Sequence, residues 1–252
     1  MSTKPPREKI IRWILQDKYK NKSNPGIAKD LARIDSGKSL DYIIGWKPFL
    51  NCKIDLSFKP LIPRPETEFW TEQVITAIRE RSPLPVKVLD IFSGSGCVGV
   101  AVLKNTKKTL VDFAEIDSRL ARQISLNLKL NRISPRRYKV IKSDIFNKIK
   151  GKYDFILSNP PYIPTNRTSK VQRSVLKNEP HKALFSGTDG LEHIKKFLSR
   201  ASEHLNANGQ IWMEFGMGQK IAIEKIIRQK YHHWQFKKDQ YGRWRFVIIF
   251  WE

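Results

Sequence analysis

The amino-acid sequence predicts a doubly wound α/β fold, in which helices cover both faces of a mostly parallel sheet. From residue 65 onward, short apolar strands alternate with amphipathic helices, which is the pattern of repeated βαβ units. A glycine-rich turn follows the first of these strands. The C-terminal segment 234–251 predicts two strands joined by a Tyr-Gly turn, and therefore an antiparallel pair.

The first part of the chain, residues 1–60, is predicted to form a small unit and a linker hairpin. Its first helix is expected at 7–20, where isoleucine and leucine side chains recur on one side. After a break at 24–26, a second helix is expected at 27–35. Residues 36–58 are predicted to form a turn and short strands.

Residues 61–252 are predicted to hold the sheet. Its strands are short and apolar enough for burial on both faces, and its helices carry one apolar stripe each. The expected strands before the C-terminal pair are 86–91, 109–116, 138–144, 153–159 and 210–215. The expected helices are 66–80, one ending at 104, 118–131, 190–206 and 217–230.

The chain is strongly basic. Its 252 residues carry 47 Lys and Arg against 24 Asp and Glu, a formal charge of +23. This excess implies an anionic partner, and a nucleic acid or a ribonucleoprotein is the first candidate. The alternative is a solvated lysine-rich surface, which the even spread of Lys and Arg along the chain favours.

Cysteine and histidine usage indicates neither a disulfide framework nor a metal site. Cys52 and Cys97 lack CxxC spacing, and the five histidines are not arranged as ligands, so no metal is predicted. No apolar run reaches ~18 residues, so no membrane span is expected. Residues 1–15 lack the apolar region of a secretion signal, and a cytoplasmic protein is expected.

The turn "DIFSGSG" lies where the first strand passes into a helix. Its glycines allow a tight turn and a close approach of the backbone to a ligand. An acid at the end of the next strand, roughly 20 residues on, can bind both hydroxyls of a ribose. Glu115 is preferred for this role, and Asp117 is close enough to compete. The candidate ligand-binding residues of the turn are Asp90, Phe92, Ser93, Gly94, Ser95 and Gly96.

The third strand ends in Asp144, followed by Ile145 and Phe146. An acid beside apolar side chains suits an adenine. The glycine turn is too short for a phosphate-binding Walker loop, so a nucleoside without a phosphate chain is expected. S-adenosylmethionine fits best. A nicotinamide dinucleotide is the alternative, and the incomplete GxGxxG pattern disfavours it.

The stretch "SNPPY" ends the fourth predicted strand, beside the glycine turn in such a fold. Two prolines give a rigid corner, in which the Asn159 carboxamide oxygen and the Pro160 carbonyl can both face a ligand. Two acceptors match the two hydrogens of an –NH₂ group, and Tyr162 can pack on the planar group that carries it. Accepting both N–H bonds localises electron density on the nitrogen and aims it at a methyl donor.

Together these residues resemble the release factor glutamine methyltransferase family. Asn-Pro-Pro-Tyr alone marks a wider class that methylates planar amino groups. The resemblance to this family, and not only to the wider class, depends on "LIPRPETE" at 61–68 and on the segments 37–49, 178–198 and 205–219. It extends from about residue 30 to the end. It implies a seven-stranded, Rossmann-like class I methyltransferase sheet.

The resemblance implies that the substrate is the glutamine of the Gly-Gly-Gln motif in peptide chain release factors, with S-adenosylmethionine as cofactor. A monomer is expected. The implied substrate residues are Asn159 and Pro160, which hold the amide, with Pro161 and Tyr162 completing the site. The implied cofactor contacts are Gly94 and Gly96 at the methionine end, Glu115 at the ribose, Asp144 and Ile145 at the adenine, and also Asn159. Arg64, Glu66 and Glu68 are expected near the site, or else in helix capping.

The sequence departs from the family pattern in two places. Phe92 replaces the first glycine of the cofactor turn, and its ring is expected to narrow the methionine end or to shift the backbone. The N-terminal helical domain is abbreviated, so docking is expected to be weaker or to rely on charge. The basic surface would then meet the acidic face of a release factor, or make a weak contact with ribosomal RNA.

Two other functions compete with a release factor methyltransferase. A nucleic-acid amino methyltransferase is favoured by the charge, because lysines and arginines bind phosphates. Such enzymes usually need an added domain or insert for base flipping, and this chain has no room for one. A binding module that has lost catalysis is the third reading, and Phe92 is its only support.

Overall fold

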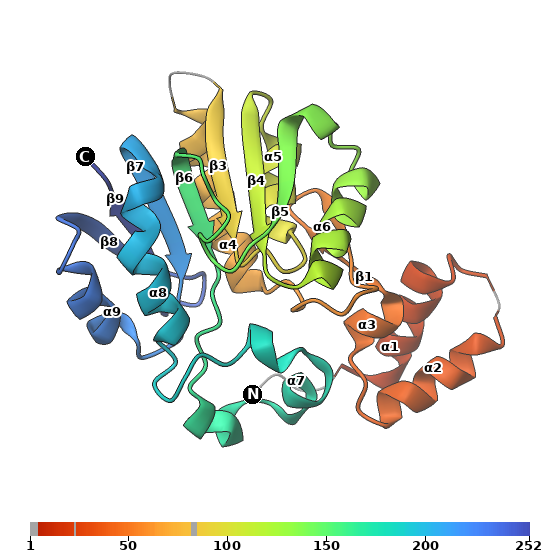
Figure 1. Cartoon of the computed structure of the whole chain (residues 1–252). Helices are drawn as coiled ribbons and strands as arrows, with labels where there is room; N and C mark the ends of the chain where they lie inside the picture. The colour runs from red at the N-terminus through yellow and green to blue at the C-terminus, as the bar shows by residue number, and fades with distance from the viewer. Residues whose placement is uncertain (1–4, 23, 82–84) are drawn as a thin grey trace.

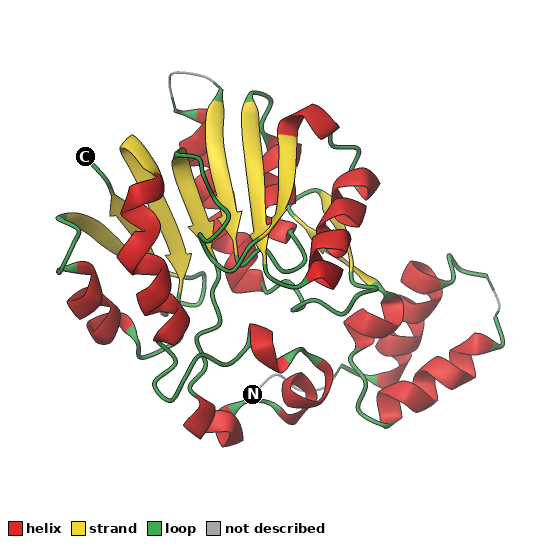
Figure 2. Ribbon diagram, in the orientation of Figure 1, coloured by secondary structure: helices red, strands yellow, loops and turns green. Residues whose placement is uncertain are grey.

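The computed structural model describes residues 5–22, 24–81 and 85–252. Its main part is a seven-stranded sheet with helices on both faces (Figures 1 and 2). The strand order is β5-β4-β3-β6-β7-β9-β8, and the pairs from β5 through β7 are parallel. The last two strands are antiparallel to each other, and β9 runs antiparallel to β7. The predicted doubly wound fold with an antiparallel C-terminal pair is therefore confirmed.

The observed elements follow the predicted ones closely. The strands of the sheet are β3 (Val86–Ile91), β4 (Thr109–Glu115), β5 (Tyr138–Lys142), β6 (Tyr153–Ser158), β7 (Leu205–Glu214), β8 (His233–Lys238) and β9 (Trp244–Phe250). The helices that cover it are α4 (Pro65–Arg79), α5 (Cys97–Asn105), α6 (Ser118–Leu130), α8 (Glu192–Ala201) and α9 (Lys220–Ile227).

Alternate side chains of the strands enter two separate cores. In β3, Val88 packs with α4, α5 and α6 on one face, whereas Leu89 packs with α8 and α9 on the other. This alternation follows from the two-residue period of a strand. Because both faces are covered, β3 and β6 are buried at every residue except the second, Lys87 and Asp154, which explains the apolar runs that follow.

The start of β7 differs from the prediction. A helix was expected to continue to residue 206, but α8 ends at Ala201 and a 3₁₀ turn, η5 (Ser202–His204), follows. The buried Leu205 already pairs with Tyr153 of β6, and the register then shifts before Gln210 pairs with Phe155. This irregularity interrupts the alternation of buried and exposed side chains, so the sequence pattern does not show that β7 begins at Leu205.

The N-terminal helices form a small cluster beside the sheet (Figure 1). It contains α1 (Arg7–Trp13), which continues as the π-helical turn η1 (Ile14–Lys18), then α2 (Gly26–Asp35) and α3 (Leu40–Ile44). Four isoleucines form its buried centre, namely Ile10, Ile14, Ile34 and Ile43. The helix α3 was not predicted, since residues 36–58 were expected to hold a turn and strands.

The hairpin of β1 (Trp46–Phe49) and β2 (Cys52–Asp55) packs its buried side chains into the core of the sheet domain, and it also contacts the N-terminal helices, where Trp46 Nε1 donates to the Asp17 carbonyl at 3.1 Å. Helix α6 supplies polar side chains to its backbone. The Asp55 N–H donates to Asn127 Oδ1 at 2.7 Å, and the Lys53 N–H donates to Asn131 Oδ1 at 2.9 Å. The division of the chain at residue 60 stays a prediction.

The carboxyl edge of the sheet brings together two segments that are far apart in the sequence. Strand β3 lies between β4 and β6, so the turn after β3 and the corner after β6 leave the sheet side by side. Ligands bind at such a point in open α/β sheets. An irregular segment that was not predicted lies below this edge in Figure 1, with η3 (Thr165–Lys170), α7 (Arg173–Asn178) and η4 (His181–Ala183).

This segment also contacts the N-terminal helices. Lys177 donates to the Ser36 carbonyl at 2.7 Å, and Asn178 donates to the Gly37 carbonyl at 2.9 Å. The described helices include none whose length and apolar composition would let it span a membrane.

Replacement of Asn127 by alanine is expected to lower the free energy of unfolding by roughly 2–4 kcal/mol. The buried Asn127 carboxamide accepts from the Asp55 N–H and donates to the Ser95 carbonyl, so alanine leaves both groups without a partner. Urea denaturation measures the change. Ser125→Ala is the control, because this exposed serine bonds only within its own helix. A loss for Asn127→Ala no larger than that of the control would contradict the account.

Candidate active site

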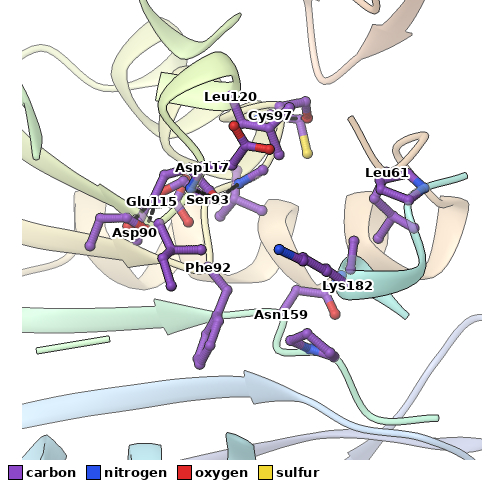
Figure 3. Close-up of a pocket in the computed structure, with 18 of the residues that line it drawn as sticks. Leu61, Asp90, Phe92, Ser93, Cys97, Glu115, Asp117, Leu120, Asn159 and Lys182 are labelled. Atoms are coloured by element: carbon purple, nitrogen blue, oxygen red, sulfur yellow. Dashed lines mark hydrogen bonds between the residues drawn. The ribbon is translucent and has the colours of Figure 1, made fainter. Parts of the chain in front are cut away.

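A cavity of about 350 Å³ lies at the carboxyl ends of β3, β4, β5 and β6. Its size is within the range of small-molecule sites. Figure 3 shows acidic and turn residues on one side of it, with Asn159 and Lys182 on the other. The predicted residues that line it are Asp90, Phe92, Ser93, Gly94, Ser95, Glu115, Asp117, Asp144, Ile145, Asn159, Pro161 and Arg64. Gly96, Pro160, Tyr162, Glu66 and Glu68 do not line it.

The two glycines of the turn after β3 have different roles. Gly94 and Gly96 have φ values of +55° and +75°, which favour glycine. A side chain at Gly96 would collide with Ile124 at 3.1 Å, whereas one at Gly94 would meet no heavy atom nearer than 3.9 Å. Gly96 therefore allows packing against α6, and the face of Gly94 is free for a ligand.

Glu115 closes the turn from the end of β4. Its Oε2 accepts from the Gly94 N–H at 2.8 Å, and its Oε1 accepts from the Asp117 N–H at 2.9 Å. Burial raises the pKa of Glu115 despite these bonds. Each carboxylate oxygen has a further lone pair, so Glu115 can still accept from ligand hydroxyls. Asp117 also lines the cavity, but it caps α6 and pairs with Arg119 at 2.8 Å.

Asp90 is a buried carboxyl group in the cavity wall. Its Oδ2 accepts from the Gly99 N–H at 2.9 Å. A side chain at position 99 would lie 2.4 Å from the ring of Phe113, so this close approach requires glycine. Burial raises the pKa of Asp90 to about 8, and the nearby Glu115 contributes to the increase. Asp90 can therefore gain or lose its proton near neutral pH, and in its ionised form it can pair with a cationic group in the cavity.

Phe92 keeps the backbone conformation that glycine would adopt. Its φ is +58°, which is costly for a residue with a bulky side chain. Its ring packs edge-on against His193 and Phe197 of α8, with centroids 6.0 and 6.3 Å away. The ring thus forms part of the cavity wall on the α8 side, and the turn retains its left-handed residue without the glycine.

The end of β5 contributes less than expected. Asp144 and Ile145 line the cavity, and Ile145 also has a positive φ of +46°. Phe146 does not line it, because its ring is buried in a stack with Phe197 and His204. The exposed Ile116, which follows Glu115, also lines the cavity and adds apolar surface.

Hydrogen bonds to Tyr162 fix the corner after β6. Gln219 donates to the Tyr162 carbonyl at 2.9 Å, and the Tyr162 hydroxyl donates to Glu214 at 3.2 Å. A side chain at Gly190 would lie 2.3 Å from the Tyr162 carbonyl. Asn159 and Pro161 are the members of the corner that line the cavity. Asn159 therefore presents its carboxamide to the same cavity as the glycine turn.

Sequence reasoning missed several residues that line the cavity, and also Glu179, which lies just outside its lining. Glu179 is buried and accepts from Arg64 Nη2 at 2.6 Å and from the Ile62 N–H at 3.3 Å. These bonds join the segment before α4 to the segment before η4, and residues of both segments line the cavity. Thr67, Lys182 and His193 also line the cavity. Burial lowers the pKa of His193, whose Nδ1 lies 2.8 Å from Ser186 Oγ. Arg64, Thr67 and Glu179 lie in segments that carry the family resemblance, which was the available signal.

The site therefore has two chemical ends. Asp90, Glu115 and Asp117 provide acceptors for hydroxyl or cationic groups, and Asn159 provides a carboxamide across the cavity. This arrangement suits a polar nucleoside ligand on one side and an uncharged planar group on the other.

Two replacements of Phe92 separate its backbone strain from the packing of its ring. Both alanine and glycine remove the ring, but only glycine adopts φ +58° without strain. The Phe92→Gly variant is expected to be more stable than Phe92→Ala by about 1 kcal/mol. Thermal and urea unfolding compare them. Equal stability, or a more stable alanine variant, would show that the turn relaxes away from this conformation.

Comparison with known proteins identifies relatives of the chain. Residues 71–187 match the family model "Methyltransferase small domain". The release factor glutamine methyltransferase of Thermodesulfovibrio yellowstonii is 36% identical over 212 residues, covering 83% of this chain and 75% of that protein. The release factor glutamine methyltransferase of Streptococcus pneumoniae is 33% identical over 243 residues, covering 94% of this chain and 84% of that protein.

A solved structure, the hMettl16 catalytic domain in complex with MAT2A 3′UTR hairpin 6, has a similar fold. The TM-score is 0.64 at 17% identity, and the match covers 99% of this chain and 93% of that chain. At this identity the likeness concerns the fold alone. The sequence relatives cover most of both chains, so this protein belongs to the release factor glutamine methyltransferase family.

Proposed function

We propose that the protein transfers a methyl group from S-adenosylmethionine to the glutamine side-chain amide of the Gly-Gly-Gln motif in peptide chain release factors. One observation carries the proposal: Asn159 and the glycine turn with Glu115 line a single cavity. The family to which the chain belongs supports the choice of a protein amide as the acceptor.

The residues of the cavity fit S-adenosylmethionine. Glu115 would accept from the ribose hydroxyls, and Asp144 with Ile145 and the exposed Ile116 would surround the adenine. Asp90 would hold the cationic ammonium, for which the open face of Gly94 leaves room. Lys182, on the opposite wall, is suited to the carboxylate of the methionine (Figure 3). When bound, the cofactor supplies an electrophilic methyl group on its sulfonium.

The protein's own contribution to the transfer is positional. Asn159 Oδ1 would accept one N–H of the substrate amide and so turn the nitrogen toward the cofactor end of the cavity. The Pro160 carbonyl stays the predicted second acceptor, and Tyr162 stays a predicted support of the corner. Two accepted N–H bonds raise the electron density on an amide nitrogen whose lone pair is otherwise delocalised. Its proton can leave as the new bond forms, so no strong base is required.

The competing functions receive less support. The named relatives favour a protein substrate over a nucleic acid. The intact left-handed turn at Phe92 weakens the case for a module that has lost catalysis. A weak contact between the basic surface and ribosomal RNA, and a monomeric state, remain predictions.

The proposed reaction is tested by mass spectrometry of a purified release factor after incubation with the protein and S-adenosylmethionine. The motif glutamine is expected to gain one CH₂ unit. Asn159→Ala is expected to lower kcat by about 10²–10³, the usual effect of losing one positioned hydrogen-bonding group. Asn147→Ala is the control, because this exposed asparagine does not line the cavity and accepts from Arg200 at 2.8 Å. No methylation by a protein that binds the cofactor would refute the release-factor substrate.

Binding of the cofactor is expected to depend on pH through Asp90. Below about pH 8 this carboxyl is protonated in the free protein, so a cationic ligand must displace a proton to bind. The affinity should therefore rise with pH toward about 8 and fall again where the ammonium of the ligand loses its own proton. Asp90→Asn keeps the size of the side chain but cannot ionise, so its affinity should be about 10- to 100-fold lower and should not rise with pH below about 8.

Calorimetric titration from about pH 6 to about pH 9 measures this linkage. S-adenosylhomocysteine is a second probe, because it keeps the ammonium and lacks the sulfonium charge. The same rise in affinity below about pH 8 is expected for both ligands if Asp90 holds the ammonium. A dependence that survives Asp90→Asn would assign it to another group.

A further inference from the structure

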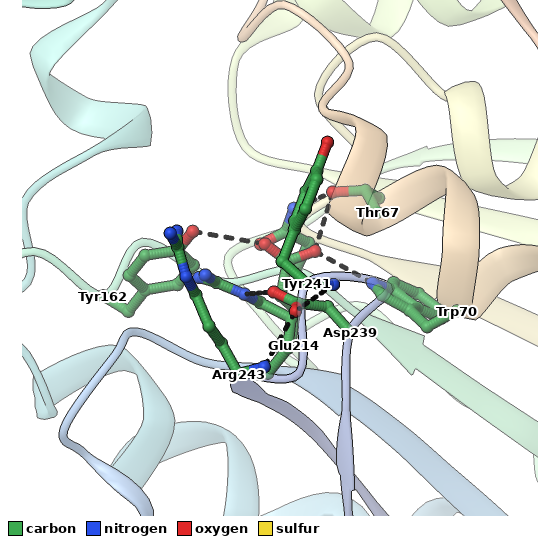
Figure 4. Close-up of polar contacts among 9 residues, drawn as sticks. Thr67, Trp70, Tyr162, Glu214, Asp239, Tyr241 and Arg243 are labelled. Carbon is green, nitrogen blue, oxygen red and sulfur yellow. Dashed lines mark hydrogen bonds and ion pairs between the residues drawn. The ribbon is translucent and has the colours of Figure 1, made fainter. Parts of the chain in front are cut away.

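A buried carboxylate lies behind the Asn-Pro-Pro corner, outside the cavity. Glu214, at the end of β7, is 1% exposed. Its Oε2 accepts from Thr67 Oγ1 at 2.7 Å and from Trp70 Nε1 at 2.8 Å. Its Oε1 accepts from the Tyr162 hydroxyl at 3.2 Å. Figure 4 shows these side chains converging from α4, from the corner and from β7. Burying a carboxylate is costly, so this arrangement calls for an explanation.

The surroundings of Glu214 act on its charge in opposite directions. Burial raises the pKa of Glu214, while its three donors and the nearby Arg245 favour the ionised form. Arg245 is itself fixed by a pair with the buried Asp239 at 3.1 Å. The indole N–H of Trp70 can only donate, so Oε2 must accept from it. In a neutral carboxyl the carbonyl oxygen is the better acceptor, so a proton would lie on Oε1 and Oε2 would still accept from Thr67.

Because Oε2 of Glu214 accepts, the Thr67 hydroxyl must donate to it. A hydroxyl has one hydrogen, and Thr67 uses it on Oε2 of Glu214. Toward Asn159 the same hydroxyl can then only accept, and Asn159 Nδ2 lies 3.2 Å from it. The flipped carboxamide would place two acceptor oxygens against each other with no hydrogen between them. The NH₂ end of Asn159 is therefore fixed at Thr67, which leaves Oδ1 for the cavity.

We propose that Thr67 and Glu214 form a relay that sets the orientation of the Asn159 carboxamide for catalysis. The inference rests on the proposed function, in which Asn159 Oδ1 accepts an N–H of the substrate amide. A flipped Asn159 would instead present N–H groups to the substrate N–H groups. Thr67 is thus a positioning residue that acts through Asn159, and Glu214 acts one step further back.

The start of α4 explains how Thr67 reaches this place. The helix begins at Pro65 after an extended Arg64, which suits proline at a first helical position. Thr67, Trp70 and Thr71 then lie on one buried face, at spacings of three and four residues. Thr71 is equally buried, but its hydroxyl donates only to the Thr67 carbonyl of its own helix, at 2.6 Å. It is therefore a matched control for the loss of a buried hydroxyl.

The kinetic test compares Thr67→Val, which removes the hydroxyl, with Thr67→Ser, which keeps it, and with Thr71→Val. For methylation of the release factor, Thr67→Val is expected to lower kcat about 10- to 100-fold, the effect of one misdirected hydrogen bond. Its Kd for S-adenosylmethionine and its KM for the release factor should stay close to those of the wild type. Thr67→Ser should restore most of kcat, and Thr71→Val should leave it unchanged.

A double variant shows whether Thr67 acts through Asn159. If it does, Thr67→Val should have little further effect on kcat in the Asn159→Ala background. Additive losses, or equal values of kcat for Thr67→Val and Thr71→Val, would overturn the relay. Melting temperatures identify any variant that merely fails to fold.

A second measurement does not require methyl transfer. The side-chain NH₂ resonances of Asn159 are assigned by their absence in Asn159→Ala. In the wild type one of the two protons should show the downfield shift of a hydrogen-bonded amide, and Thr67→Val should abolish it. If the wild type does not methylate the release factor, the proposed function fails, and this spectrum still decides the orientation. An unchanged spectrum in Thr67→Val would refute the relay by itself.

Discussion

The parallel pairing of β3 with β6 is the constraint on which the site depends. Ile91 lies opposite Ser158 in this pair, so the chain leaves both strands at the same level of the sheet. The glycine turn follows the first strand and the Asn-Pro-Pro corner follows the second. Without this register, a nucleoside pocket and a holder for an amide would not face one cavity. The remaining walls are built around these two exits.

Four buried acids lie in these walls or behind them. Each of them accepts hydrogen bonds from backbone or side-chain donors; they are Asp90 and Glu115, which line the cavity, and Glu179 and Glu214, which do not. Buried carboxyl groups cost stability, even when they are paired. In return, their acceptors are fixed before a ligand arrives. The polarity of the site is therefore carried by groups that cannot reorient freely.

The sequence was sufficient for the fold because its strands are continuous apolar runs, and because glycines and prolines mark the ends of β3 and β6. It also predicted that Asp90, Glu115 and Asn159 lie together, since they stand at or next to the carboxyl ends of strands, and all three line one cavity. Hydrogen bonds between side chains of distant segments could not be predicted from the sequence. Thr67 and Glu214 are 147 positions apart, and no periodicity connects them. The segment 165–183 was missed because its helical turns are short, and the direction of the Phe92 ring depends on α8.

The central claim is that one cavity holds the cofactor and the substrate amide, with Asn159 as the acceptor. A crystal structure of the protein with S-adenosylhomocysteine and a peptide that contains Gly-Gly-Gln tests this directly. The account predicts a hydrogen bond from the glutamine amide to Asn159 Oδ1, and an amide nitrogen that faces the cofactor sulfur. A glutamine bound elsewhere, or an Asn159 that donates to it through Nδ2, would contradict the account.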